Sequence, residues 1–166
     1  MDSVSPSRPP RILMADDADD FVLITRMVFE RAQRPVEIHH VRHGRACLDF
    51  LRRAPPYANA PEPDVVMLDL DMPIMDGRLT LEEIVADEAI RHVPVVVLSH
   101  HDEPDDVMRM YRLRCSAYLR KPAEYKQWVE LVTKFFDFWL ASALLPSRIA
   151  SAPDPSYEWA SPKTRV

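Results

Sequence analysis

Acidic side chains gather at two places in this sequence, and each place follows a short apolar run. Four aspartates occur within the seven residues MADDADD at 14–20, next to the apolar run RILMA at 11–15. Asp69 lies inside a second apolar run, DVVMLDL at 64–70, and Asp71 follows it directly. An unpaired charge within a buried strand is costly, so these carboxylates require a cation close by.

A hydroxyl group and an ammonium group end two further apolar runs. Ser99 closes VPVVVLS at 93–99, and Lys121 follows AYLR at 117–120. Ligands of open parallel sheets bind at the carboxyl ends of the strands, so all these side chains are expected to meet there. Carboxylate oxygens suit Mg²⁺, and a lysine beside them can pair with a carboxylate or neutralise a phosphoryl oxygen. The sequence therefore predicts an oxygen-lined magnesium site with an adjacent ammonium group.

Short apolar runs alternate with helical patterns along the whole chain. VEIHHV at 36–41 is typical of a further strand, which makes five strands with the four runs above. The helical patterns cover 21–32, 45–53, 77–90, 103–114 and a longer stretch at 124–144. Uniformly apolar strands that are each followed by a helix indicate a parallel sheet covered on both faces. We therefore predict an α/β fold, a doubly wound five-stranded parallel sheet with helices on both faces.

The length and composition fit one compact domain. The chain has 166 residues, of which 47% are hydrophobic, enough for a core of ordinary size. We assign the folded domain to residues 11–144, preceded by a flexible N-terminus at 1–10. Residues 145–166 are rich in proline and serine, and we expect a tail that is disordered or forms an interface arm. This tail is too short for a second folded domain.

Several classes of function are not favoured. The net charge of -5 argues against a nucleic-acid-binding surface. No run approaches the ~18 apolar residues that span a bilayer, and the N-terminus lacks the apolar region of a signal peptide. We therefore expect no membrane association and a cytoplasmic location, where Cys47 and Cys115 stay reduced. With only two glycines, the chain has no glycine-rich phosphate loop of the Walker or Rossmann type.

The segment LDLDMPIMDG at 68–77 resembles the phosphoacceptor segment of receiver domains in two-component response regulators. The resemblance covers roughly residues 10–144 and implies the flavodoxin-like receiver fold. It implies that Asp69 is the nucleophile that takes a phosphoryl group from a histidine kinase. Such a protein catalyses its own phosphorylation and dephosphorylation and turns over no separate substrate, so it is not an enzyme in the usual sense.

The same resemblance implies roles for the other residues of the site. Asp16, Asp69 and Asp71 would hold Mg²⁺, Asp71 through its backbone carbonyl. Ser99 and Lys121 match the residues that contact the phosphoryl oxygens, so Asp69, Ser99 and Lys121 form the catalytic set. This chemistry agrees with the physical reading, since a carboxylate attacks phosphorus while the two cations balance the accumulating charge.

Three further matches concern the surroundings of the site. Tyr118 matches the aromatic position that changes rotamer on activation. The Lys121–Pro122 bond matches the family's cis peptide. His100 stands where receivers generally carry a small residue that controls access to the phosphoryl group, and its bulk is expected to hinder attacking water.

The MADDADD stretch can be aligned with the family in two registers. Matching Leu23 and Ile24 to the core positions of the first helix makes Asp16 the direct metal ligand. Ala15 then takes the place of the first of two acids, so that Mg²⁺ binding is weakened unless Asp17 replaces the missing carboxylate. On this register Ala15→Glu should tighten Mg²⁺ binding. A shift by one residue makes Asp16–Asp17 the acidic pair instead.

The start of the first helix falls at the end of the same stretch. Asp20 is expected at the helix start, where its charge favours the N-terminus. Asp19 is expected to be merely solvated.

The end of the domain resembles the single-domain regulators paired with bacterial phytochromes. The resemblance rests on AYLRKPAEYKQWVELVTKFFDFWL at 117–140 and on the long proline-rich connection APPYANAPEP at 54–63. It implies a phytochrome-linked histidine kinase as the partner. With no room for an output domain after residue 144, the output would be protein–protein interaction, phosphoryl relay or a phosphate sink.

The last helix, at 124–144, carries a wide apolar face. Its apolar residues cover an arc of about 200°, whereas packing on one sheet face needs about 100°. Surplus apolar surface of this kind marks an interface. We therefore predict a symmetric homodimer built on this helix.

Two alternatives remain open. Haloacid dehalogenase-type phosphatases also use an Asp-x-Asp pair, here Asp69 as nucleophile and Asp71 as acid/base. Their motif follows the first strand, however, whereas two strands precede Asp69, and Met-Pro stands where that family has a threonine. The second alternative is a degenerate receiver that binds partners without phosphorylation. The presence of Asp16, Asp69, Ser99 and Lys121 argues against it.

Overall fold

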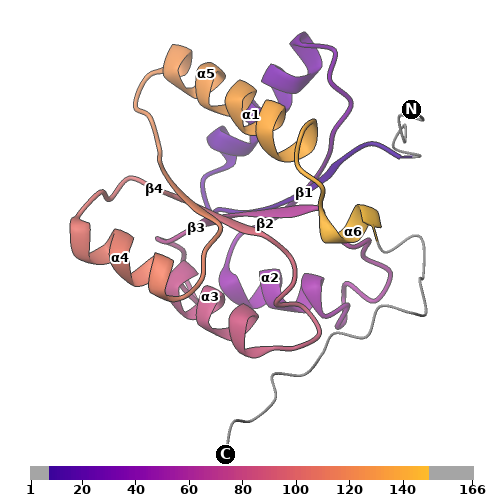
Figure 1. Ribbon diagram of the computed structural model, residues 1–166, viewed down its shortest axis with the longest axis vertical. Coiled ribbons are helices and arrows are strands. Elements are labelled where there is room, and N and C mark those ends of the chain that lie inside the picture. Colours follow the sequence, from indigo (N-terminus) through magenta and orange to yellow (C-terminus); the bar gives the residue numbers. More distant parts are fainter. Residues whose placement is uncertain (1–7, 150–166) are drawn as a thin grey trace, which may run out of the picture.

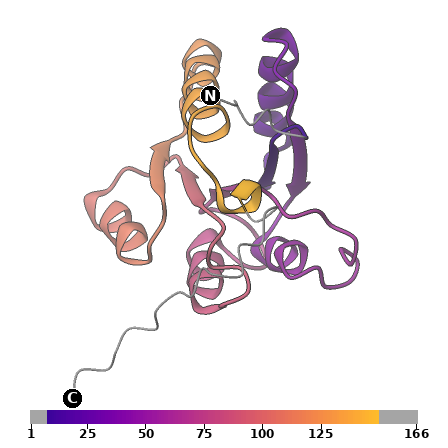
Figure 2. The same ribbon diagram turned by 45° about the vertical axis from the view of Figure 1, so that its right-hand side comes forward.

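The computed structural model describes residues 8–149. It contains one sheet of five parallel strands in the order β2-β1-β3-β4-β5. The strands are β1 (Arg11–Ala15), β2 (Glu37–Val41), β3 (Val65–Asp69), β4 (Val95–Ser99) and β5 (Ala117–Arg120). The main helices are α1 (Asp19–Arg31), α2 (Gly44–Leu51), α3 (Gly77–Ala86), α4 (Pro104–Arg112) and α5 (Tyr125–Phe135). Helices α1 and α5 cover one face of the sheet and α2, α3 and α4 the other (Figures 1 and 2), which confirms the predicted doubly wound α/β fold.

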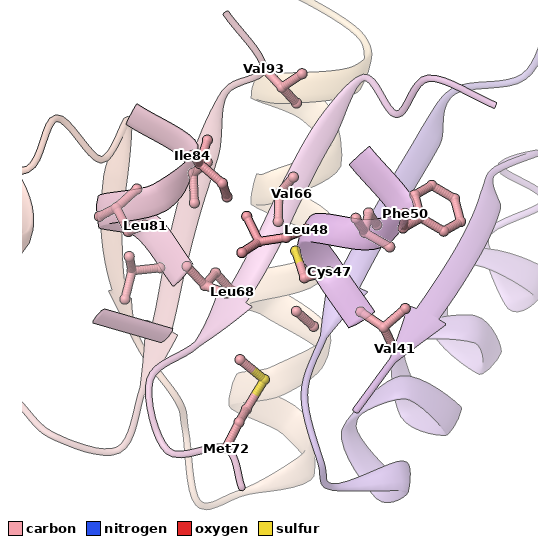
Figure 3. Close-up of a cluster of buried hydrophobic side chains, with 14 of the residues drawn as sticks. Val41, Cys47, Leu48, Phe50, Val66, Leu68, Met72, Leu81, Ile84 and Val93 are labelled. Atoms are coloured by element: carbon pink, nitrogen blue, oxygen red, sulfur yellow. The ribbon is translucent and has the colours of Figure 1, made fainter. Parts of the chain in front are cut away.

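The central strands contribute side chains to two separate cores. In β1, Leu13 and Ala15 belong to the cluster beneath α2 and α3, whereas Ile12 and Met14 belong to the cluster beneath α1 and α5. This alternation follows from the two-residue period of a strand, and β3 and β4 repeat it. Figure 3 shows the first cluster, in which Leu48 of α2 lies near side chains of β3. Burial on both faces explains why the strands are apolar throughout.

None of the helices within residues 8–149 combines the length and apolarity needed to cross a bilayer.

The loop after β3 is fixed by a glycine and a cap. Asp76 caps α3, since its carboxylate accepts a hydrogen bond of 2.9 Å from the backbone N–H of Leu79. At Gly77 a Cβ atom would collide with the backbone carbonyl of Asp69, so only glycine lets the helix begin this close to the strand end. The close approach holds the loop at 70–76 beside Asp69.

Helix α1 begins directly after the acidic stretch. Asp19 and Asp20 lie in its first turn, where their charge favours the helix N-terminus, as predicted for Asp20. Asp19 is not merely solvated, because its carboxylate accepts a hydrogen bond of 2.8 Å from Arg42. The N-cap residue, Ala18, offers no side-chain cap, and its own N–H bonds instead to the Asp16 carboxylate at 2.9 Å.

The last helix is shorter than the prediction of 124–144. Helix α5 ends at Phe135 and passes into a π-helical turn, η1 (Phe136–Leu140), in which the Ala141 N–H bonds the Phe136 carbonyl at 3.0 Å. The turn adds one residue to the helical repeat, so the buried Leu140 follows Phe135 by five positions and returns to the core side. The sequence pattern alone did not indicate this change of period.

The described structure continues to residue 149, past the predicted end of the domain at residue 144. Leu145 is buried, and a short helix, α6 (Pro146–Ile149), follows it. The fully buried Asp64 accepts hydrogen bonds from Arg8 at 3.0 and 2.9 Å, from the Arg11 N–H at 2.7 Å and from the Ser147 hydroxyl. One carboxylate thus joins both ends of the described chain at the amino edge of the sheet. The predictions for residues 1–7 and 150–166 lie outside the described residues.

Candidate functional site

Two buried carboxylates share one buried ammonium group at the carboxyl edge of the sheet. Lys121 follows β5, and its Nζ lies 2.6 Å from an Asp16 carboxylate oxygen and 3.3 Å from an Asp69 oxygen. The three side chains are 2%, 4% and 5% exposed, respectively. Asp16 follows β1 and Asp69 ends β3, so the neighbouring positions of these strands bring the carboxylates together.

Ser99 lies at the same edge, as predicted. It ends β4 and is fully buried, and its carbonyl accepts a hydrogen bond of 2.7 Å from the Lys121 N–H. This bond ties the ends of β4 and β5 together and fixes where the lysine side chain begins. The Ser99 hydroxyl oxygen accepts a hydrogen bond of 3.1 Å from the His101 N–H, and the hydroxyl can also act as a donor.

Asp71 directs its carboxylate away from the buried pair. Its oxygens lie 2.9 Å from the His101 ring nitrogen and 3.8 Å from Arg78, and the side chain is exposed. The metal contact predicted for Asp71 is made by its backbone carbonyl and not by its carboxylate. These side-chain contacts therefore do not test it, and it remains a prediction. The acid/base role that a haloacid dehalogenase-type phosphatase would give this carboxylate has no support in these contacts.

Ala15 is a core residue, and the register that places it at an acidic position is wrong. It is fully buried in β1, pairs with Val41 and Leu68, and belongs to the cluster beneath α2 and α3. Strand β1 ends at Ala15, and the two residues that follow it, Asp16 and Asp17, both belong to the carboxylate cluster. These two residues therefore form the acidic pair, as in the second register. The site is therefore not short of a carboxylate.

Three carboxylates converge closely enough to hold a metal ion. Ligand oxygens of Asp16, Asp17 and Asp69 all lie within 4.8 Å of one another, and Asp17 is exposed to solvent. Mg²⁺ takes oxygen ligands, usually one or two carboxylates, and keeps several waters, so this donor set fits it. When bound, Mg²⁺ supplies positive charge that offsets the repulsion among the carboxylates and an incoming phosphoryl group.

The electrostatics of Asp69 differ from those of an ordinary surface carboxylate. The pKa of Asp69 is raised to about 6: burial is the largest cause, Lys121 lowers the pKa, and the neighbouring Asp16 raises it. The ammonium group alone therefore does not balance the two carboxylates. This imbalance is what a second cation at the site would relieve.

The surroundings of the site locate Tyr118 and correct the expectation of a cis peptide. The Tyr118 hydroxyl donates a hydrogen bond of 2.9 Å to the His101 carbonyl, so this half-buried ring lies against the β4–α4 loop. The peptide bond before Pro122 is not cis; the cis bond of the described chain is Pro55–Pro56. Lys121 reaches both carboxylates without the cis geometry.

Two neighbours of the site were not anticipated from the sequence. A ring nitrogen of His40, on β2, lies 2.7 Å from the Asp16 carbonyl and supports the backbone of the acidic loop. Phe21, on α1, places its ring 4.5 Å from the Lys121 ammonium. Neither residue belongs to a chemical motif; a strand histidine and a helix phenylalanine ordinarily indicate packing. The register of β1 against β2, which pairs Met14 with His40, is the signal that could have located the histidine.

The comparisons with known proteins agree with this geometry. Residues 12–133 match the family model described as response regulator receiver domain. The response regulator Rcp1 of Synechocystis is 33% identical over 142 residues, which cover 85% of this chain and 97% of Rcp1. The chain therefore belongs to the response regulator receiver family, and this assignment replaces the haloacid dehalogenase-type alternative.

Solved structures of the same family superpose closely. The phosphorylated cyanobacterial phytochrome response regulator RcpA aligns with a TM-score of 0.80 at 34% identity, over 84% of this chain and 99% of RcpA. The Mn²⁺-bound form of Rcp1 gives 0.78 at 33% identity, over 83% and 99% of the two chains. RPA3017, a response regulator in red light signaling of R. palustris, gives 0.76 at 35% identity, over 82% and 98%. A divalent cation in Rcp1 is consistent with a metal site at the Asp16–Asp17–Asp69 cluster.

We predict that Ala15→Glu destabilises the protein and does not improve the metal site. A glutamate there would bury an unpaired charge, which should lower the free energy of unfolding by about 3 kcal/mol or more.

Asp17→Asn should leave folding intact and weaken Mg²⁺ binding roughly tenfold or more, because a carboxylate of the cluster is lost. Urea unfolding and calorimetric Mg²⁺ titration measure the two effects.

The matched control is Asp20→Asn, which removes a neighbouring exposed carboxylate outside the cluster and should leave Mg²⁺ affinity nearly unchanged. A folded Ala15→Glu protein that binds Mg²⁺ more tightly would restore the first register.

We also predict that Asp69→Asn stabilises the metal-free protein in a pH-dependent way. The folded pKa of Asp69, about 6, lies above its unfolded value of about 3.9, so the ionised carboxylate opposes folding and this cost grows as pH rises between those values. Removing the charge should add about 3 kcal/mol at pH 7.5 and almost nothing at pH 4. Urea unfolding in EDTA at both pH values measures the gain, and an equal gain at both would contradict the account.

Proposed function

We propose that this chain works as a single-domain response regulator that accepts a phosphoryl group on Asp69 from a histidine kinase. The observation that carries the proposal is the buried Lys121 ammonium, which contacts the carboxylates of Asp16 and Asp69 at the carboxyl edge of the sheet. Ser99, the last residue of β4, lies at the same edge. A buried ammonium shared by two carboxylates beside a buried hydroxyl suits phosphoryl transfer, where the protein mainly positions groups and balances charge.

The residues present define the chemistry of the step. A carboxylate oxygen of Asp69 forms a bond to phosphorus, and the bond from phosphorus to the kinase histidine breaks, its electron pair leaving with the imidazole. Lys121 keeps its proton and neutralises a phosphoryl oxygen, while the Ser99 hydroxyl donates a hydrogen bond to another. In the metal-free protein the pKa of Asp69 is raised to about 6, and a cation bound beside it would favour the ionised, nucleophilic form.

Return of the protein to its resting form closes the proposed cycle. Water attacks the phosphoryl group, the bond from phosphorus to the Asp69 oxygen breaks, and inorganic phosphate leaves. The chain would thus catalyse its own phosphorylation and dephosphorylation, and its output would be a change in protein–protein contacts. Tyr118, which binds the backbone of the β4–α4 loop, lies where such a change could be transmitted.

We further propose that the kinase partner is phytochrome-linked. RcpA is a phytochrome response regulator, and RPA3017 works in red light signaling. The match to Rcp1 spans 97% of that protein, so the receiver domain makes up nearly all of that relative. We place the pair in the cytoplasm, a reducing compartment that suits the free, buried Cys47 and Cys115.

The direct test of the proposal is phosphotransfer from candidate kinases. A phytochrome-linked histidine kinase labelled with [³²P]ATP should pass its label to this protein in the presence of Mg²⁺, and Asp69→Asn should abolish the transfer. Glu88→Gln, which removes an exposed carboxylate far from the site, should leave transfer unchanged. A folded, Mg²⁺-loaded protein that takes no label from any kinase or from acetyl phosphate would instead support the phosphorylation-independent receiver.

We also propose a homodimer through the face of α5 and η1. The apolar surface left outside the core is narrower than predicted, since Val129, Leu131, Phe136 and Trp139 also pack, partly buried, against the core. Phe138 and Tyr125 nevertheless remain 60% and 47% exposed, and Leu144 follows at 87%. Exposed apolar side chains on α5, on η1 and in the segment that follows η1 supply the apolar centre that a symmetric interface needs.

Charge at this face should separate the subunits. We expect Phe138→Glu to shift sedimentation from dimer to monomer, and Phe138→Glu combined with Leu131→Glu to do so completely. Circular dichroism confirms folding, which the half-buried Leu131 makes necessary. Met108→Glu on α4 is the control, because Met108 is 51% exposed on the opposite side of the sheet. An unchanged sedimentation coefficient for Phe138→Glu would count against the dimer.

A further inference from the structure

The Lys121 ammonium has a third neighbour besides its two carboxylates. Its Nζ lies 4.5 Å from the centroid of the Phe21 ring, while Asp16 and Asp69 lie at 2.6 and 3.3 Å. The face of an aromatic ring attracts a cation, and the attraction grows when both groups are shielded from water. The Lys121 side chain is only 2% exposed and Phe21 is half-buried, so the contact is largely shielded from water.

Phe21 is itself held in place by aromatic contacts on two sides. Trp128 of α5, which is 1% exposed, meets it edge-on with ring centroids 4.8 Å apart. His100, the residue after Ser99, lies 5.7 Å away in a tilted contact. A row of three rings therefore runs from the β4–α4 loop across α1 to α5, with the ammonium beside its central member.

The row explains how an ammonium can stay at this point of the site. Among its neighbours Asp16 makes the shorter contact and competes with Asp69 for the lysine. An aromatic face stabilises the cation without accepting a conventional hydrogen bond, so all three N–H groups remain available to carboxylate and phosphoryl oxygens. Without the ring the ammonium would face water, and its attraction to a phosphoryl oxygen would be screened.

We propose that Phe21 is a positioning residue for the phosphorylation of Asp69. Its ring holds the Lys121 ammonium beside the carboxylate that reacts and covers the side of the ammonium that faces α1. Phe21 takes no part in bond making: the Asp69 oxygen bonds to phosphorus, the donor's bond to phosphorus breaks, and Lys121 keeps its proton. The inference rests on the proposed function, since it concerns the same reaction.

A purely structural role for Phe21 predicts a different behaviour. In that case any ring of the same shape would serve equally well, because only volume and apolar contact matter. In the proposed role the negative electrostatic face of the ring matters, and weakening it must slow the reaction even when the shape is preserved.

Fluorinated phenylalanines at position 21 separate the two roles. Incorporating 4-fluoro-, 3,5-difluoro- and 3,4,5-trifluorophenylalanine weakens the ring face in steps with little change in volume. The rate of Asp69 labelling by acetyl phosphate at saturating Mg²⁺ should fall with each step, reaching roughly three- to tenfold below that of the natural protein. The same series at Phe29, which is buried on α1 and packs on Phe136, should leave the rate unchanged.

A second measurement tests the contact itself. Nuclear Overhauser effects between the Phe21 ring protons and the Lys121 ε-methylene protons should be visible in the unphosphorylated protein. Their absence would overturn the inference whatever the labelling rates are.

The remaining outcomes can be told apart. Equal labelling rates across the Phe21 series, with the natural protein labelled normally, would overturn the role of Phe21 and leave the proposed function intact. A decline of similar size at Phe29 would show a packing effect and would also overturn it. If the natural protein takes no label at all, the proposed function fails and the inference fails with it.

Discussion

The shared ammonium group of Lys121 is the interaction on which the functional edge depends. Burying two carboxylates beside one ammonium is costly, and the shared lysine offsets only part of that cost. Removal of the lysine would leave Asp16 and Asp69 as adjacent buried like charges. The sheet order, the bond from the Lys121 N–H to Ser99 and the close approach at Gly77 all serve to hold this arrangement.

The two edges of the sheet treat a buried carboxylate in opposite ways. At the amino edge, burial by itself raises the pKa of Asp64, but hydrogen bonds from Arg8, Ser147 and the Arg11 backbone outweigh it and lower the pKa. At the carboxyl edge, Asp69 has fewer partners and its pKa rises to about 6. Asp64, whose oxygens are fully hydrogen-bonded, holds the two ends of the described chain together. Asp69, whose charge is only partly compensated, can bind a cation and react.

Much of this arrangement could be predicted from the sequence, because the strands are apolar throughout and polar residues mark where they end. Asp69, Ser99 and Lys121 lie at three strand ends, as expected. The first register fails at Ala15 because it relies on the helix, whose first turn begins at Asp19, whereas the acidic pair is positioned by the strand, which ends at Ala15. A small residue such as Ala15 can occupy either the buried end of a strand or the loop that follows it. Only the pairing of β1 with β2 and β3, which includes Ala15, decides between these two positions.

Other features depend on contacts between distant segments and left no pattern in the sequence. The bonds of Asp64 to both chain ends, the π-helical turn after Phe135 and the ring of Phe21 over Lys121 are of this kind. Each joins residues far apart along the chain or breaks a period. Sequence periodicity indicates which face of a helix or strand is buried, but not which side chains of distant segments pack against that face.

The central claim is that Asp69 is a phosphoacceptor whose charge is balanced by Lys121 and a divalent cation. Mass spectrometry of the protein after incubation with acetyl phosphate tests it most directly. The account predicts one added phosphoryl group, located on Asp69, that forms with Mg²⁺ and does not form in EDTA. Labelling at another residue, or labelling of Asp69 that is indifferent to EDTA, would contradict it.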